Sequence, residues 1–429
     1  MKSIIKNLIL GAIVLGGLNM YAQNSKRHID NFRQPDQTGI NTFEAPKETE
    51  STFDGLKVRV GGASTLQFQA LDHENSGATP LAELGSNFNL PTANLDLDVV
   101  LAEGVRMHLR TYLSSRHHPE PYVKGGYFQI DKLDFISEGF LSDIMQYATI
   151  KVGHMENNYG DAHFRRSDNA QTIFNPFIGN LIMDSFTTEV GAELYYQRNG
   201  FLGMVGFSNG KLNQSVVAGA NGRTGGAAFL AKIGYDKQLN DDLRLRLTGS
   251  LYNTGYTPNL YLFNADRAGS RYYHVMEAEG ASSDNFRSGR FAPNFKNSVT
   301  AIMINPFVRY KGFEFFGTLE RASGSTNANP ATLDPEMDGV TNQFASELLY
   351  RFGKNDNFYV GGRYNVVNSE YDDKAQDITI KRTQLGAGWF MTKNILMKAE
   401  YVHQNYDGFS GALEDGKFDG FMLEAAISF

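Results

Sequence analysis

Residues 243–252 read LRLRLTGSLY, and their alternation decides the fold class. Leucine stands at positions 243, 245, 247 and 251, with arginine, threonine and serine between. Alternate side chains of a β-strand point to opposite faces, whereas a helical repeat of about 3.6 residues would scatter these leucines around the axis. The same alternation recurs at 104–113, where arginine and histidine alternate with valine, methionine and leucine. Each segment therefore predicts a strand with one apolar and one charged face.

Segments of this kind continue to the end of the chain, and we count sixteen. A strand that crosses a bilayer at a tilt needs about ten residues of such alternation. The predicted strands are 57–70, 92–101, 104–113, 126–136, 146–153, 188–197, 200–208, 226–236, 241–252, 298–310, 312–320, 341–352, 357–367, 379–391, 394–403 and 420–429.

The connections between these segments alternate between seven short and eight long ones. An even-numbered antiparallel barrel with both chain ends on one side has this arrangement, with short turns in the periplasm and long loops outside. A soluble sandwich or propeller, the alternative, has no reason to sort its loops by length. The predicted fold class is therefore all-β: a transmembrane antiparallel β-barrel of about 16 strands with short periplasmic turns and long extracellular loops.

The composition agrees with such a barrel and excludes other classes. Aromatic residues make up 12% of a chain with 44 glycines and 20% charged residues. The absence of cysteine excludes disulfide scaffolds, thiolate metal sites and cysteine nucleophiles. The net charge of -7 argues against nucleic acid as a partner. Beyond the N-terminus, no run of about 18–20 apolar residues predicts a membrane-spanning helix.

Residues 1–22 have the order of a secretory signal peptide: Lys2 and Lys6, then an apolar stretch, then a small residue at Ala22. The alternative is a buried N-terminal core helix. Residues 23–56 are polar and unpatterned, and we expect a flexible periplasmic extension there. The barrel is then expected to occupy 57–429.

The polar face of the predicted strands carries too many charged residues to form a dry core. The apolar face is therefore expected to contact lipid and the polar face to line water. Aromatic residues stand where strands meet short turns, which predicts a girdle of rings at the lipid interface, although each pair could instead form a core cluster. These pairs are Tyr196 and Phe201, Tyr310 and Phe313, Phe352 and Phe358, and Trp389 and Phe390.

The last nine residues, FMLEAAISF, form an amphipathic strand that ends in Phe429. With the hairpin 389–401 before it, this strand resembles that of sixteen-stranded outer-membrane porins, and the porin O and P (phosphate-selective) type more than the enteric matrix porins. The resemblance covers the chain from about residue 57 and is one of architecture. It implies export to the outer membrane of a Gram-negative bacterium, a homotrimer, and contact with membrane lipid and lipopolysaccharide. It also implies passive diffusion of small hydrophilic solutes and ions, with neither catalysis nor a cofactor.

By the same resemblance, the third long connection, 154–187, folds into the pore and narrows it; the alternative is an outer loop that packs on a neighbouring subunit. The charged residues expected in this constriction loop are Glu156, Asp161, Arg165, Arg166 and Asp168.

Strand residues on the polar face are candidates for the pore lining. The basic ones are Arg106, Arg110, Arg244, Arg246, Arg309, Arg351, Arg363, Arg382 and Lys398. The acidic ones are Asp96, Asp98, Glu193, Glu314, Glu347 and Glu400. Arg351, Arg363 and Arg382 lie on consecutive strands and predict a diagonal basic ladder. Such a ladder would make the pore weakly anion-selective, because basic groups concentrate anions in a narrow passage. Alternatively, these arginines pair with carboxylates and stiffen the wall.

Three further classes of site were considered. His154 and His163 bracket Glu156, but their spacing alone does not predict a metal site; acidic loop 334–339 leaves incidental Ca2+ binding open. Ser114 or Ser115 near His117 is a weak candidate for an outer-membrane hydrolase, which no nucleophile motif supports. The long connection 253–297 is rich in tyrosine and arginine, so a plugged barrel that binds or assembles with another surface protein is the alternative function.

Overall fold

The computed structural model describes residues 29–114, 118–168, 171–211, 225–257, 260–264, 272–281, 287–295, 297–325, 338–370 and 377–429. The predicted signal peptide, 1–22, lies outside this range. Within it, no helix is long and apolar enough to cross a membrane.

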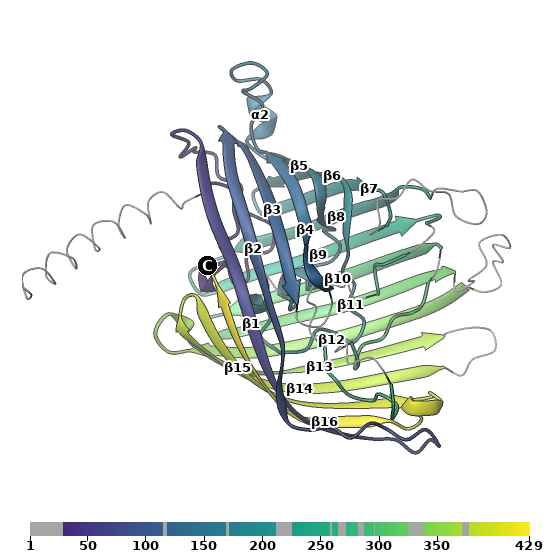
Figure 1. The fold of residues 1–429 in the computed structure, drawn as a ribbon. Helices are drawn as coiled ribbons and strands as arrows, with labels where there is room; N and C mark the ends of the chain where they lie inside the picture. Colours follow the sequence, from purple (N-terminus) through teal and green to yellow (C-terminus); the bar gives the residue numbers. More distant parts are fainter. Residues whose placement is uncertain are drawn as a thin grey trace, which may run out of the picture.

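Sixteen antiparallel strands form a closed barrel in which each strand pairs with its neighbours in sequence (Figure 1). The strands are β1 (Lys57–Glu74), β2 (Asn87–Ala102), β3 (Val105–Ser114), β4 (His118–Ile130), β5 (Ala148–Glu156), β6 (Thr188–Arg198), β7 (Phe201–Ser208), β8 (Ala228–Gln238), β9 (Leu243–Thr254), β10 (Val299–Tyr310), β11 (Phe313–Ser325), β12 (Asp338–Phe352), β13 (Phe358–Glu370), β14 (Ile378–Thr392), β15 (Ile395–Asp407) and β16 (Lys417–Ser428).

Within the described ranges, helical structure is confined to short pieces in the N-terminal segment and in the connections. These are α2 (Ser142–Met145), η1 (Gln37–Gly39), η2 (Ala162–Arg165), η3 (Thr172–Phe174), η5 (Lys354–Asp356) and η6 (Gly411–Leu413). The barrel closes where β1 pairs with β16, from Ala63 opposite Ser428 to Glu74 opposite Lys417. A closed ring leaves no strand edge unpaired, which a lipid environment requires of every backbone polar group.

The two faces of each strand differ as the alternation predicts. On β12, Glu347 is 2% exposed and faces inward, while its neighbour Leu348 is 57% exposed and faces outward. The same holds on β9, where Arg246 is buried and Leu247 is exposed. The predicted closed barrel of sixteen strands is therefore confirmed, with its apolar surface outside.

All sixteen predicted segments coincide with strands, but the fourth was placed too far along the chain. Residues 131–136 are not strand; the chain leaves β4 after Ile130. The Asp131 carboxylate accepts hydrogen bonds from Lys47, Thr149 and Gln129, and its backbone N–H donates to the Gly104 carbonyl of the β2–β3 turn at 2.6 Å. The connection to β5 is consequently longer than predicted and contains α2, which projects from the end of the barrel that carries the short turns (Figure 1).

Aromatic side chains gather on the outer surface near this short-turn end. Phe352, Phe358 and Trp389 stack in sequence, with ring centroids 5.7 and 6.1 Å apart. Phe201 packs against Tyr235 of the neighbouring strand. Of the eight rings expected in the girdle, Phe390 is an exception: it is buried on the inner face with Leu349, Tyr359 and Leu396. It follows Trp389 directly, and successive strand residues cannot share a face.

Candidate functional site

Three segments fill much of the barrel interior. They are 29–49 at the N-terminus, 157–187 between β5 and β6, and the described parts of 255–298 between β9 and β10. In the second segment, Phe177, Ile178 and Ile182 are fully buried. The interior of this barrel is thus a packed space with cavities rather than a wide central pore.

The third long connection crosses the interior and bonds to the inner face of the far wall. Arg165 donates to Glu314 on β11 at 2.8 Å and to Glu347 on β12 at 3.0 Å. The Ile178 N–H donates to Glu400 on β15 at 2.7 Å. The Ile182 N–H donates to Asn365 on β13, also at 2.7 Å. These contacts anchor the connection to strands far from β5 and β6.

The remaining charges of this connection are paired within the interior. Asp161 accepts from Arg246 and Lys232, at 2.8 and 2.7 Å. Arg166 forms an ion pair with Asp184 at 2.6 Å, and Asp168 pairs with Lys124 at 3.0 Å. Glu156, at the end of β5, accepts from His163 at 2.7 Å.

The N-terminal segment 29–49 also lies inside the barrel, at the short-turn end. Phe43 packs against Phe307 and Phe316 on the wall, and Asn41 donates to Glu314 at 2.6 Å. Glu44 pairs with Arg246 and Lys232, at 2.7 and 3.0 Å. The polar composition of this segment gives no sign of such packing: a flexible extension was expected, and instead these residues are held by the wall.

Two carboxylates of the interior segments, Glu44 and Asp168, stay ionised at neutral pH. Burial alone raises the pKa of Glu44, but Arg246 and Lys232 outweigh it and hold that pKa at about 2. Likewise, burial raises the pKa of Asp168, and Lys124 with Arg166 lowers it to about 2. The segments are therefore joined to the wall by full ion pairs.

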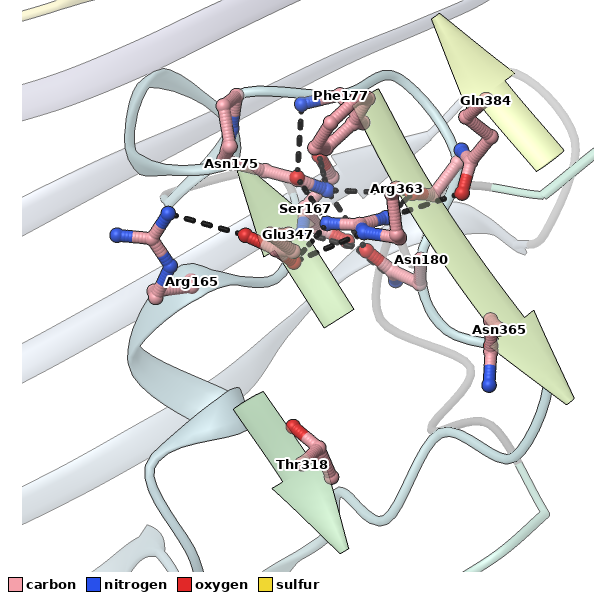
Figure 2. Close-up of polar contacts among 12 residues, drawn as sticks. Arg165, Ser167, Asn175, Phe177, Asn180, Thr318, Glu347, Arg363, Asn365 and Gln384 are labelled. Carbon is pink, nitrogen blue, oxygen red and sulfur yellow. Dashed lines mark hydrogen bonds and ion pairs between the residues drawn. The ribbon is translucent and has the colours of Figure 1, made fainter. Parts of the chain in front are cut away.

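The predicted basic ladder lies on the inner wall but is bonded to protein groups. Arg351 donates to Glu314 at 2.9 Å. Arg363 pairs with Glu347 at 2.7 Å and donates to Asn175 and the Gly179 carbonyl (Figure 2). Arg382 donates to Gln404 and to the Asn180 and Gly289 carbonyls.

Three more predicted basic residues face the same interior. Lys398 pairs with Glu424 at 2.6 Å and donates to three carbonyls of the third connection. Arg244 pairs with Asp236 at 2.7 Å. Arg309, at the short-turn end, is 40% exposed and pairs with Asp356. The alternative interpretation, in which basic residues stiffen the wall through carboxylates, describes these contacts.

The predicted acidic residues are buried on the inner face as well. Asp96 accepts two bonds from Arg110, both at 2.9 Å. Asp98 accepts from Arg59 and His108, at 3.0 and 2.8 Å. Glu193 accepts from the Asn158 N–H at 3.0 Å and from the Tyr195 hydroxyl. Glu400 accepts from Tyr273 at 2.8 Å in addition to the loop N–H.

A cavity of about 190 Å3 runs along the inner wall of β2 to β6, from Arg106 near the β2–β3 turn to Lys124, Glu156 and Thr188. At the short-turn end, Arg106 also lines a wider recess of about 680 Å3 between the N-terminal segment and the turns. On the opposite wall, the cavity lined by Glu347 and Arg363 holds about 10 Å3. A further recess of about 370 Å3 lies at the short-turn end, beside Arg244 and Arg246.

Several residues of this interior were not among the sequence candidates. Lys151, Lys124 and Lys232 lie on the polar faces of strands, so the alternation could have found them. Phe32 and Arg33 lie in the N-terminal segment, where no period marks an inward position.

The other candidate sites stay apart or outside the described range. His154 bonds to Thr188 at 3.1 Å, while His163 bonds to Glu156 and Asn158. Among described residues, no group of three or more acidic or histidine side chains could hold a metal ion. Ser115 and His117 of the hydrolase candidate, and 334–337 of the calcium candidate, lie outside the described residues.

No protein-family model matches the chain, and no curated protein matches its sequence. Solved structures do match its fold. An anion-selective porin from Comamonas acidovorans is 11% identical, with a TM-score of 0.52 over 87% of this chain and 100% of that one. OprB of Pseudomonas putida at high pH is 10% identical, with a TM-score of 0.52 over 87% and 94%.

A third match is OmpT, an outer membrane protein of Vibrio cholerae, folded in vitro and in a trimer form. It is 12% identical, with a TM-score of 0.50 over 88% of this chain and 100% of that one. At such identities the likeness concerns the fold alone. The chain thus has the architecture of outer-membrane porins, and its sixteen strands with an apolar outer surface suit a multi-pass place in that membrane.

Proposed function

We propose that this protein is an outer-membrane porin through which small hydrophilic solutes and ions diffuse passively, with a weak preference for anions. The observation that carries the proposal is the closed sixteen-stranded barrel whose inner face is charged and whose outer face is apolar. A barrel of this size is wide enough to enclose an aqueous path, whereas barrels of about eight strands are filled by side chains. The chemistry of the interior is electrostatic, and we propose no catalytic role and no cofactor.

Within the porins, we propose the porin O and P type, on the alternation and the terminal strand. The trimer form among similar folds supports a homotrimer as the assembly, surrounded by membrane lipid and lipopolysaccharide. Residues 1–22 are proposed as the export signal that is removed on the way.

The test is single-channel recording in a planar lipid bilayer, with the purified mature protein and a KCl gradient across the membrane. We expect current steps of uniform size and a reversal potential that is displaced from zero toward the equilibrium potential of chloride. Uniform steps with a reversal potential displaced toward the equilibrium potential of potassium would contradict the anion preference but not the porin function. Folded protein without conductance would remove the porin itself.

The packed interior favours one alternative, a plugged barrel that serves as a binding or assembly partner of another surface protein. Segments 29–49 and 157–187 are both hydrogen-bonded to the inner wall of the barrel. These segments occupy interior space and so narrow any path that solutes could take. A barrel that stays closed to ions, yet is isolated from native membranes with a stoichiometric second protein, would establish this function instead.

A further inference from the structure

The room inside the barrel is distributed unequally between its walls. The cavity along β2 to β6 holds about 190 Å3. The cavity beside Arg363 and Glu347 holds about 10 Å3, close to the roughly 10–15 Å3 that a single water requires. Of these two interior cavities, the one with room for a solute lies beside β2 to β6, away from the barrel axis.

The lining of the β2–β6 cavity carries more positive than negative side chains. Its cations are Arg33, Arg59, Arg106, Arg110, Lys124 and Lys151, and its carboxylates are Glu44, Asp96, Glu156 and Glu193. Arg59, Arg110 and Lys124 are each paired with an aspartate at about 3 Å.

The other cations of this lining are bonded differently. Arg33 donates to the Gly39 and Phe164 carbonyls. Lys151 lies over the rings of Tyr127 and Tyr195, at 5.8 and 4.9 Å from their centroids. Neither contact neutralises a charge, because carbonyls and rings carry only partial negative charge.

Arg106 is the most exceptional of these side chains. It is 5% exposed, and its Nη2 donates to Gln129 at 2.6 Å and to the Asn31 carbonyl at 3.3 Å. Its Nε and Nη1 are buried and have no hydrogen-bond partner among the described residues. A buried charged donor without a partner is costly, so such a group calls for a ligand or water. Arg106 also stands where the β2–β6 cavity meets the short-turn recess.

We propose that solutes cross the barrel along the β2–β6 wall. Small anions such as chloride, carboxylates or phosphate bind the Arg106 guanidinium as they pass, and Lys151, which lines the same cavity, adds a second positive charge. This proposal rests on the proposed porin function and assigns its anion selectivity to the cavity along β2 to β6. The planar guanidinium suits an oxyanion because two N–H groups can donate to two oxygens.

The carboxylates of the same lining do not cancel this preference. Glu156 accepts from His163 and Gln171, at 2.7 and 2.8 Å. Glu193 is held by Tyr195 and Asn158, and Glu44 by Arg246. Their oxygens are directed into these bonds, whereas Nε and Nη1 of Arg106 have no acceptor among the described residues.

The first experiment uses the absence of cysteine to map the route. Lys151→Cys and Gly125→Cys place a thiol in the cavity; a Cβ at Gly125 would lie 3.6 Å from its nearest neighbour, an ordinary contact. Asn365→Cys and Gln384→Cys are the matched controls on the opposite wall, where both side chains are fully buried. The probe is the anionic reagent 2-sulfonatoethyl methanethiosulfonate, read by mass and by single-channel current.

We expect both cavity cysteines to be modified, with a fall in current, and both control cysteines to stay unmodified. Equal modification on the two walls, or modification only at Asn365→Cys and Gln384→Cys, would overturn the off-axis route. Mass detects the reaction whether or not the barrel conducts, so this result is independent of the porin proposal.

The second experiment tests Arg106. In a KCl gradient, Arg106→Gln and Lys151→Gln should each reduce the chloride-to-potassium permeability ratio by about half. Lys381→Gln removes the same charge from the outer face of β14, where its pair with Asp407 is about half exposed, and should leave the ratio unchanged. If wild type conducts and all three variants shift alike or not at all, the role of Arg106 is lost while the porin stands. If wild type does not conduct, the porin proposal itself fails.

Discussion

At the scale of the residue, the interior is organised by arginines that join two parts of the chain. Arg165 contacts Asn41, Glu314 and Glu347, so one side chain connects the N-terminal segment, the third connection and two strands. Arg246 similarly joins Glu44, Asp161 and Asp236. A planar guanidinium with five N–H donors can serve several acceptors at once, which a lysine ammonium cannot do in one plane.

Replacing Arg165 with glutamine should therefore destabilise the protein. Glu314 and Glu347 each lose one buried cation but keep Arg351 and Arg363, so we expect a loss below the about 3–5 kcal/mol of a buried carboxylate left without any cation, and above that of an exposed pair. Equilibrium urea unfolding in lipid vesicles measures the loss. Lys381→Gln is the matched control, because its pair with Asp407 is about half exposed and should contribute roughly 0–1 kcal/mol. Similar losses in both variants would contradict a central role for Arg165.

At the scale of the element, the N-terminal segment 29–49 occupies the barrel interior in the half that carries the short turns. It is not part of the sheet, since the barrel starts at Lys57 and closes through β1 and β16. The barrel should then form without it. Of its wall partners, Glu314 keeps Arg351 and Arg246 keeps Asp161, so its removal leaves few charges unpaired.

Deletion of residues 29–49 from the mature chain should raise the single-channel conductance, because the segment occupies interior space that ions would otherwise enter. The recording is made at one salt concentration, and circular dichroism of the same sample verifies the β-content. A folded variant whose current steps match those of the full chain would show that this segment does not limit flow.

At the scale of the whole molecule, the ion pairs that join the interior segments to the barrel wall should weaken in acid and stay intact near neutral pH. The pKa values of Glu44 and Asp168 are about 2, below their ordinary values of 4.5 and 3.8. Groups whose pKa is depressed by folding stabilise the folded state above the ordinary pKa, and this contribution disappears as pH falls toward the folded pKa.

We therefore expect the contribution of these two groups to the melting temperature to be constant between about pH 5 and 8 and to be lost between about pH 4.5 and 2. Thermal unfolding followed by circular dichroism gives the profile. Glu44→Gln should melt lower at pH 7 and show a smaller acid fall. A parallel profile in that variant would assign the acid response to other groups.

Much of the sheet could be predicted from the sequence, because period-two alternation is a local signal. It places Arg351, Arg363 and Glu347 on the inner face and Leu348 outside. The packing of segments 29–49 and 157–187 inside the barrel could not be predicted in this way. The bond from Asn41 to Glu314 joins residues 273 positions apart, and no local pattern encodes such a partner. The end of β4 was misplaced for a related reason, since Asp131 is held by Lys47 of the same unpatterned segment.

The seam between β1 and β16 makes closure of the barrel depend on the strand farthest along the sequence from β1. Twelve residue pairs hold that seam, and all of them need residues 417–428. A chain that stops short of this point exposes two unpaired strand edges, whose backbone groups cost several kcal/mol each in lipid. A barrel without residues 417–428 therefore has no stable form in the bilayer, so insertion is all-or-none: the membrane accepts the complete ring and rejects its shorter versions.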